Sequence, residues 1–516
     1  MKNRDLEAAW VYHNSTKHLY QSIHTNPHYL DWEIQPLPFK IYSKLEPIPL
    51  THHLSSPGVA ALSAIADTGS QSESSSVPGT EALAELLRLS AGITKRRSYP
   101  GGEMVFRAAA CTGALYHIDL YLVCGELPEL NPGVYHFGPH DFSLRRLRDG
   151  DYRAVVVGAT GRHPAVARAP VIVVCTSTYW RNAWKYQART YRHCYWDNGT
   201  ILANLLAAAA ARGIPAQVVV GFVDETVHRL LGLDTERGAA LSLVSLGNVP
   251  AVTQGPSLEV EPLDLETVPL SEREVDYPAI RAMHAASFLE SEDEVVAWYR
   301  HSPVGTQAED KKQTIGQIFP LRPLGDQEYS GDLVEEVILR RGSTRQFSQE
   351  SISFAQLSTM LCQSTRGIPA DFLNRGETLN ELYLIVNAVD DLPAGAYVFH
   401  RDTLSLEQLK EGNLRREAGY LGLGQHIPAD ASVDIFFLTD LTAVLDRFGN
   451  RGYRAAQLEA SITGGKLYLS AYAQGLGASG LTFFDDDVTE FFSPHAAGKS
   501  VMFLVALGKT MKRIRK

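Results

Sequence analysis

Two short stretches decide the fold: "NPGVYHF" at residues 131–137 and "PAGAYVF" at residues 393–399. Their glycine, tyrosine and phenylalanine coincide when one stretch is moved by 262 positions. The same spacing relates "SLRRLRDGDYR" (143–153) to "SLEQLKEGNLR" (405–415), and the Tyr-Arg pair at 191–192 to the pair at 453–454. A spacing that stays constant over so many positions is typical of an internal repeat. We therefore predict that the chain contains two copies of one module.

Outside this block the spacing changes. "LVSLGNV" (243–249) and "LVALGKT" (504–510) lie 261 positions apart, whereas "STK" (15–17) and "STR" (343–345) lie 328 apart. This difference predicts an insert in the first copy at about residues 35–80, which includes the polar stretch "DTGSQSESSSVPGT" (67–80) and is expected to be a loop. The predicted domains are 1–265 and 331–516, and residues 266–330 are predicted to be a helical connector and linker.

Each copy mixes strands and helices in the same order. Apolar strands flank a hairpin, a long helix follows, and an apolar strand closes the copy. Gly213 and Gly475 stand where the two long helices should end, as expected for glycine at a helix C-terminus. We predict an α+β fold in each copy. Because isologous two-fold pairing is the commonest protein symmetry, we expect the copies to pack as an intrachain pseudo-dimer.

Composition narrows the class of protein. The 516 residues have a formal net charge of −10, which argues against nucleic acid or an anionic membrane as the main partner. None of the five cysteines forms a CxxC pair, as expected in a reducing compartment. The apolar run at 201–211 is too short to span a bilayer, and the first residues lack the apolar core of a signal peptide. We therefore expect a cytoplasmic protein.

The stretch "RRGSTRQF" (340–347) places three arginines within six positions. Arginine side chains crowd together readily only where an anion or carboxylates face them. The glycines of "GLGASG" (475–480) would allow a ligand to approach the backbone closely. On the alignment above, the first copy has Tyr12, His13 and Asn248 where the second has Arg340, Arg341 and Lys509. This loss of charge predicts one anion site, in the second copy.

Together with "GALYHIDLYLV" (113–123) and the final "LGKTMKRIRK", these features resemble the nitroreductase superfamily. They resemble its SagB/ThcOx-type branch of FMN-dependent azoline dehydrogenases more closely. The resemblance implies two tandem nitroreductase-like domains with FMN in the groove between them.

The FMN site that the resemblance implies has two halves. The second copy would hold the phosphate, and the first copy would face the flavin ring. The expected phosphate-side residues are Arg340, Arg341, Ser343, Arg345, Gly475, Leu476, Gly477, Ala478, Lys509 and Arg513. The expected ring-side residues are Cys111, Thr112, Gly113, Ala114 and Leu115.

Lys185 and Tyr186 are the candidate catalytic residues, since the SagB-type enzymes carry a lysine–tyrosine pair at this place. Oxidation by a flavin requires a base that removes a proton while a hydride leaves carbon. The second copy has Arg447 and Phe448 instead, which again points to one active centre. The alternative is that Lys185 and Tyr186 belong to an aromatic lid over the groove.

No metal site is expected, because the spacing of the histidines at 13, 18, 24 and 28 matches no ligand set and no counterparts are found in the second copy. The leading functional hypothesis is an FMN-dependent oxidoreductase that oxidises a peptide-derived or other small molecule, with O2 as electron acceptor. One alternative is an NAD(P)H-dependent nitro or quinone reductase, and another is a non-catalytic flavin-binding or scaffold protein. Oligomerisation beyond the intrachain pseudo-dimer is left open.

Overall fold

The computed structural model describes residues 2–25, 27–53, 55–69, 75–99, 102–250, 259–300 and 316–511. Its strands form two large sheets and two small ones. The first large sheet contains β1 Pro47–Pro49, β4 Ile118–Cys124, β5 Gly133–Gly138, β6 Ser143–Asp149, β7 Val171–Thr178, β8 Ala216–Val219 and β9 Gly238–Leu246. The second contains β10 Ile318–Pro320, β12 Glu381–Val386, β14 Gly395–His400, β15 Ser405–Glu411, β16 Val433–Thr439, β17 Gly477–Leu481 and β18 Ser500–Gly508. The small sheets pair β2 Ile93–Tyr99 with β3 Gly102–Arg107, and β11 Ile352–Ser353 with β13 Val389–Asp390.

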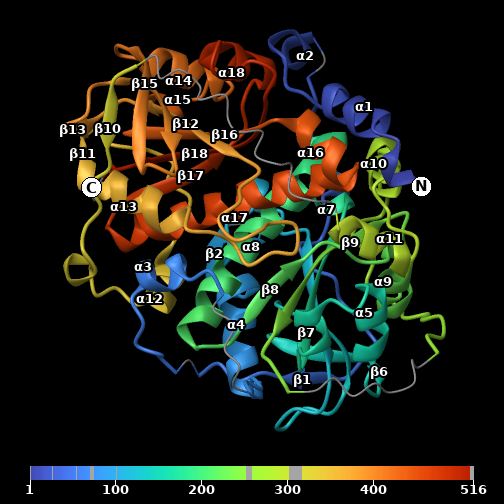
Figure 1. Ribbon diagram of the computed structural model, residues 1–516. Helices are drawn as coiled ribbons and strands as arrows, with labels where there is room; N and C mark the ends of the chain where they lie inside the picture. Colours follow the sequence, from blue (N-terminus) through green and yellow to red (C-terminus); the bar gives the residue numbers. More distant parts are fainter. Residues whose placement is uncertain are drawn as a thin grey trace.

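The two large sheets have the same topology, which confirms the predicted α+β tandem. Their orders are β1-β6-β5-β4-β7-β9-β8 and β10-β15-β14-β12-β16-β18-β17, so the strands correspond one to one. Both sheets are antiparallel throughout. Figure 1 shows the copies side by side, with the second copy in orange and red.

The helices also occur in equivalent sets. The first copy contains α1 Glu7–Ser15, α2 Tyr20–Thr25, α3 Ala61–Ala66, α4 Thr80–Ala91, α5 Arg153–Ala159, α6 Pro164–Ala167, α7 Trp180–Tyr186, α8 Thr190–Ala211 and α9 Asp224–Leu231. The rest of the chain contains α10 Pro278–Ala286, α11 Glu292–Tyr299, α12 Val334–Arg340, α13 Phe354–Ser364, α14 Arg415–Leu421, α15 His426–Asp430, α16 Leu441–Phe448, α17 Arg451–Ala473 and α18 Asp485–Phe492. Within the described residues, no helix is both long and apolar enough to cross a bilayer.

The long helices α8 and α17 pack against each other in the middle of the molecule (Figure 1). Nearly every residue of both helices is buried, as expected for helices covered on all sides. The backbones approach closely at two glycines: a Cβ at Gly465 would lie 2.5 Å from the Cβ of Ala203, and one at Gly199 would collide with the hydroxyl of Ser461. This contact makes the two copies one packed unit.

Buried ion pairs cross between the copies in an approximately two-fold arrangement. Arg192 in the first copy lies 2.5 Å from Asp485 in the second, and Arg454 in the second lies 2.9 Å from Asp224 in the first. Burial alone would raise the pKa of Asp485, but Arg192 and its neighbour Arg189 hold it well below its usual range. Removing one partner would leave an uncompensated buried charge, which is strongly destabilising.

Helices α1 and α10 occupy equivalent places beside these ion pairs. The carbonyl of His13 in α1 accepts a hydrogen bond from Arg192 at 2.7 Å, and that of His284 in α10 accepts one from Arg454 at 2.9 Å. His284 is therefore the counterpart of His13, so the expectation that the N-terminal histidines have no counterparts is wrong. The predicted domain boundaries stay a prediction, and these contacts favour assigning α10 to the second copy.

The predicted alignment of residues 15–17 with 343–345 is also wrong. Helices α3 and α12 begin at an antiparallel bridge between Ala60 and Leu333, 273 positions apart, in which Ala61 N donates to Asp332 O (2.9 Å) and Val334 N donates to Val59 O (3.1 Å). The counterparts of Arg340 and Arg341 are therefore Asp67 and Thr68 rather than Tyr12 and His13. The shared feature is only a Gly-Ser pair, at 69–70 and 342–343, and residues 70–74 lie outside the described part of the chain.

Candidate functional site

Three distant segments of the second copy converge at the arginine-rich stretch. Thr344 N donates to Ala478 O (2.8 Å), and Ser348 N donates to Lys509 O (2.9 Å). A Cβ at Gly477 would collide with the hydroxyls of Thr344 and Thr510, so this position requires glycine. The structure therefore brings the arginine-rich stretch, the start of β17 and the chain after β18 together, although 166 positions separate Thr344 from Thr510.

Of the three arginines of this stretch, only Arg340 lies in a helix. Helix α12 ends at Arg340, Arg341 is its C-cap, and the residues up to Arg345 continue as a loop. Arg340 forms an ion pair with Asp332 and donates to the carbonyl of Tyr472 at 2.7 Å. Its guanidinium is therefore already neutralised.

Arg341 reaches across to the first copy. Its Nε donates to Ala108 O at 3.0 Å, and its pKa is lowered because burial disfavours the charged form. Arg345 is exposed and lies close enough to Tyr186 to influence its titration. In the described part of the chain, neither Arg341 nor Arg345 forms an ion pair with a carboxylate, and Ser343 has no hydrogen-bond partner for its hydroxyl. These groups are available to bind an anion.

The other predicted phosphate-side residues differ in what they offer. The ammonium of Lys509 lies 3.6 Å from Glu350 and is partly exposed. Gly475 has a φ of 70° and caps α17, and Leu476 N bonds back to Ala471 O at 2.9 Å, so these two residues end the helix. Arg513 lies outside the described residues.

The ring-side segment Cys111–Leu115 is held in an unusual conformation. Gly113, Ala114 and Tyr116 have φ values of 61°, 55° and 49°, and such left-handed conformations are costly for residues with a side chain. Asp197 in α8 anchors the segment, since its carboxylate accepts hydrogen bonds from Thr112 N at 2.9 Å and from the Cys111 thiol at 3.0 Å. The fold thus fixes this backbone, and Cys111 lies close enough to Arg341 of the second copy to influence its pKa.

The sequence analysis missed Asp197 and its partner His117. His117 Nε2 lies 2.9 Å from Asp197 Oδ2, and both side chains are buried. Burial and the adjacent carboxylate raise the pKa of the Cys111 thiol well above its usual range, so the thiol stays protonated and donates to Asp197. The available signal was Asp197 itself, a carboxylate within a helix that is otherwise largely apolar and aromatic.

Tyr186 lies directly over the ring-side segment. A Cβ at Gly113 would be 2.9 Å from the Tyr186 hydroxyl. Burial raises the pKa of Tyr186 well above its usual range, so the phenol remains protonated and is suited to donate a hydrogen bond rather than to act as a base. Lys185 is exposed, with its Nζ 5.5 Å from the centre of the Tyr186 ring. The pair thus consists of a buried donor and a cation at the rim.

The equivalent region on the opposite side of the pseudo-dimer is different. Residues from the second copy pair with β8 there: Val218 N donates to Pro369 O at 2.8 Å, and Asp371 N donates to Val218 O at 3.0 Å. The adjoining cavity, of about 270 Å³, is lined by Asp67 and, among the residues that the structure describes, by no basic side chain. Burial lowers the pKa of Lys466, which donates to Gly367 O at 2.7 Å, to about 8. An anion would meet Asp67 where the other side offers arginine.

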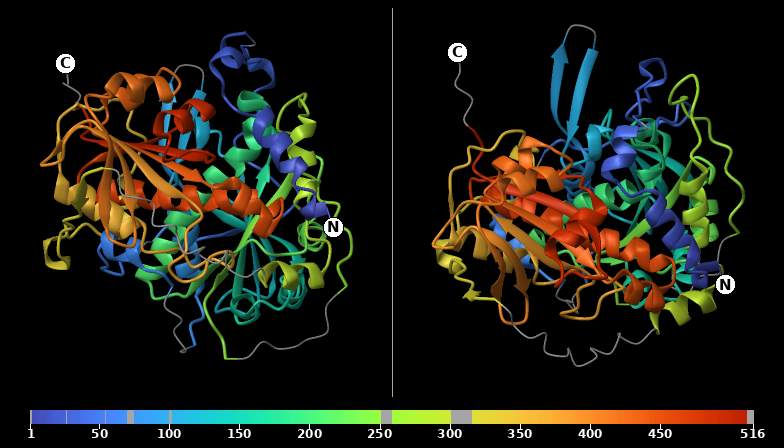
Figure 2. Two further views of the ribbon diagram at one scale, coloured as in Figure 1. Left: turned by 45° about the horizontal axis from the view of Figure 1, so that its top comes forward. Right: turned by 90° about the horizontal axis from the view of Figure 1, so that it is seen from above.

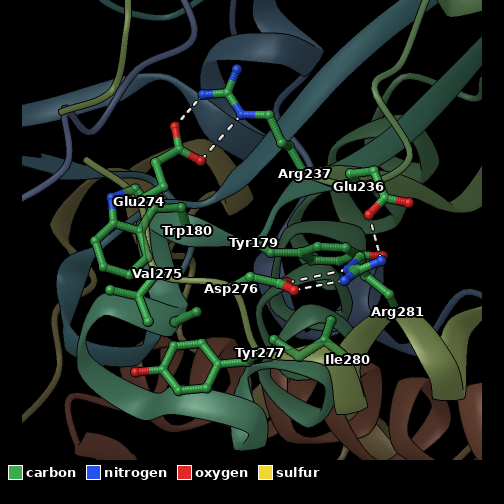
Figure 3. A pocket seen from close by; sticks show the side chains of 11 residues that line it. Tyr179, Trp180, Glu236, Arg237, Glu274, Val275, Asp276, Tyr277, Ile280 and Arg281 are labelled. Carbon is green, nitrogen blue, oxygen red and sulfur yellow. Dashed lines mark hydrogen bonds and ion pairs between the residues drawn. The ribbon is translucent and has the colours of Figure 1, made fainter. Parts of the chain in front are cut away.

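A cavity of about 500 Å³ lies elsewhere, between α7 and the start of α10 (Figure 3). Its cations already have anionic partners, since Arg237 pairs with Glu274, and Arg281 pairs with Asp276 at 2.6 Å. No residue predicted for the site lines this cavity.

One buried trio, Asp224, His228 and His284, has the residue types of a metal site, but Arg451 and Arg454 form ion pairs with the Asp224 carboxylate. We therefore assign no metal to it.

Comparison with known proteins identifies the family. The nitroreductase family model matches residues 78–248 and 338–509, which together exceed half of the chain. The crystal structure of a "putative nitroreductase" from Anabaena variabilis ATCC 29413 covers 98% of this chain and 99% of its own, with 27% identity and a TM-score of 0.77. "Putative nitroreductase MJ1384" from Methanocaldococcus jannaschii is 23% identical over 149 residues, which are 29% of this chain and 72% of that protein. Two matches to one family model, on two equivalent sheets, show that the chain belongs to the nitroreductase family.

Proposed function

We propose that the chain is an FMN-dependent oxidoreductase with one composite active site. Membership of the nitroreductase family supports an oxidoreductase. The observation that carries the cofactor is the pair Arg341 and Arg345, which have no carboxylate partner in the described part of the chain and lie beside the ring-side segment of the other copy.

The residues of the arginine-rich loop and of the ring-side segment fit the two ends of FMN. A phosphate dianion favours guanidinium groups and hydroxyl donors, and Arg341, Arg345 and Ser343 supply these in one loop. The fixed backbone at 111–115 provides a rigid wall for a planar ring. The second copy would bind the phosphate and the first copy would bind the ring. One cofactor would therefore require both copies.

The chemistry follows from the side chains beside the ring-side segment. Bound FMN would supply two-electron chemistry by exchanging a hydride with the substrate. The protonated phenol of Tyr186 is placed to donate a hydrogen bond to a substrate heteroatom and so to orient it. Lys185 at the rim is placed to exchange a proton with substrate and solvent. Asp197 keeps Cys111 and Thr112 in place by accepting their hydrogen bonds.

We propose the oxidative direction on a peptide-derived or other small substrate, as in SagB/ThcOx-type azoline oxidation with O2 as acceptor. The Lys185–Tyr186 pair beside the ring-side segment supports this. The second candidate, an NAD(P)H-dependent reductase of nitro compounds or quinones, is favoured by the nitroreductase relatives.

The two directions can be separated without knowing the natural substrate. The FMN-loaded protein is mixed anaerobically with NADH, NADPH or a thiazoline-containing peptide, and flavin absorbance near 450 nm is followed. Bleaching by the thiazoline peptide alone supports the oxidative proposal. Rapid bleaching by a nicotinamide alone would instead support the reductase. A purified chain that takes up no FMN would refute both and leave a scaffold.

A further inference from the structure

The hairpin formed by β2 and β3 is a feature of the first copy alone. Equivalent positions are 273 apart at the bridge between Ala60 and Leu333, but 262 apart in the central strands. The hairpin accounts for this difference. Figure 2 shows it projecting from the body of the molecule at the border between the two copies. The two strands pair only with each other among the described residues, so each has an open edge.

One face of the hairpin is anchored and electrically neutral. Arg96 lies 2.7 Å from Glu103 and also donates to the carbonyl of His140 at 3.4 Å. Val105, the cross-strand partner of Arg96, is buried. These contacts hold the base of the ribbon against the turn between β5 and β6.

The opposite face combines cations with exposed apolar groups. Lys95 lies across from Phe106, and Arg97 lies across from Met104. In the described part of the chain, neither Lys95 nor Arg97 has a carboxylate partner, and the Arg97 guanidinium lies 5.5 Å from the centre of the Phe106 ring. Met104 is 48% exposed and Tyr99 is 52% exposed. A chain with a net charge of −10 thus presents an uncompensated basic and apolar strip.

This strip leads directly into the proposed active site. Strand β3 ends at Arg107, and the carbonyl of the next residue, Ala108, is the one to which Arg341 donates at 3.0 Å. The ring-side segment begins three residues later at Cys111. A chain bound along the hairpin would therefore end beside the groove.

We propose that an extended acidic peptide segment binds the hairpin as an added strand along the open edge of β2. Its acidic side chains would lie on the face that carries Lys95 and Arg97. A strand places every second side chain on the same face, so glutamates at alternate positions would lie beside Lys95 and Arg97. The net negative charge of the whole chain would disfavour anionic peptides over much of the remaining surface. The proposal goes beyond the proposed function, because such binding needs no flavin.

The test is a fluorescence-anisotropy titration with the full chain as purified. The probe is a labelled twelve-residue peptide that alternates glutamate and threonine, and a lysine–threonine peptide of the same length is the control. We expect the glutamate peptide to bind, with affinity that falls as salt is added. The double variant Lys95→Glu/Arg97→Glu should bind it at least about tenfold more weakly.

A matched variant, Arg168→Glu/Arg416→Glu, makes the same change in charge at two other exposed arginines. It should bind the glutamate peptide within about twofold of the unaltered chain. FMN affinity should be the same in both variants, which shows that each is folded and separates this test from the flavin proposal. Equal losses in both variants, or no binding to the unaltered chain, would overturn the inference.

Other occupants give different results. If the strip were an interface with a second copy, light scattering would show a dimer that the hairpin variant abolishes. If it met lipid, the chain would bind vesicles of anionic phospholipid and ignore the peptide. A peptide N-methylated at alternate amides that binds as well as the parent would overturn strand addition. Each of these results contradicts the proposal.

Discussion

Removal of the two unpaired guanidiniums should release FMN from the chain. In Arg341→Ala/Arg345→Ala, the proposed phosphate site loses two charge-assisted hydrogen-bond donors. Each such bond contributes about 1.5–3 kcal/mol, so the double variant should lose about 3–6 kcal/mol of binding free energy. Its Kd should therefore rise by roughly two to four orders of magnitude. Arg341 also bridges the copies through Ala108, so the thermal midpoint of the apoprotein must be measured alongside.

The assay is titration of apoprotein with FMN, followed by quenching of flavin fluorescence. The matched control is Arg340→Ala, because Arg340 already pairs with Asp332 and should contribute little to the phosphate. We expect an endpoint of one FMN per chain in the unaltered protein and in the control. A second FMN is not expected, because Asp67 would repel its phosphate and the segment at Pro369 pairs with β8 in the equivalent region. An endpoint of two, or a double variant that binds FMN within tenfold of the control, would refute the assignment.

Two further predictions concern single side chains. Tyr186→Phe should retain FMN but lower turnover of the substrate by roughly two- to tenfold, as expected for loss of one hydrogen bond of about 0.5–1.5 kcal/mol; unchanged steady-state kinetics would contradict its role. Burial raises the pKa of Asp371 from 3.8 to about 6, so its ionisation opposes folding: its contribution is favourable below pH 4 and is lost as pH rises through 6. Denaturant unfolding should therefore show stability falling between pH 4 and 6 by up to about 3 kcal/mol relative to Asp371→Asn, and parallel pH profiles of the two proteins would contradict this.

The repeat could be predicted from sequence where both copies bury strands. Strands of the two sheets need similar apolar residues at matching places, so the spacing of 262 survives in the hairpin at 133–138 and 395–400. Helices α1 and α10 lack this constraint. Helices α1 and α10 share little more than His13 with His284 and Thr16 with Ser287, because those residues alone contact the buried arginines. A match of two residues is too short to find without the structure.

The candidate site was predictable only in part, for a related reason. The arginines could be recognised because clustered charge is rare, and Gly477 because glycine permits close approach of two chain segments. Asp197 acts on Cys111 and Thr112, 86 and 85 positions away, through contacts that no local pattern records. The apparent partner of residues 343–345 was misplaced because the true counterpart of this stretch begins with Asp67 and Thr68 in place of Arg340 and Arg341, which removes the similarity together with the charge.

Fusion of the two copies explains how such asymmetry could arise. In a symmetric dimer, replacement of Arg341 by another residue would remove both phosphate sites at once, because each subunit supplies the same loop. In one chain, the first copy can carry Asp67 and Thr68 at these positions while the second retains Arg340 and Arg341. The freed region then accepts the chain at Pro369, which pairs with β8 and adds contact between the copies. The ion pairs of the buried arginines with Asp224 and Asp485 remain symmetric, because each of them stabilises the fold. The residues of the proposed FMN site are free to differ between the copies once a single site is sufficient.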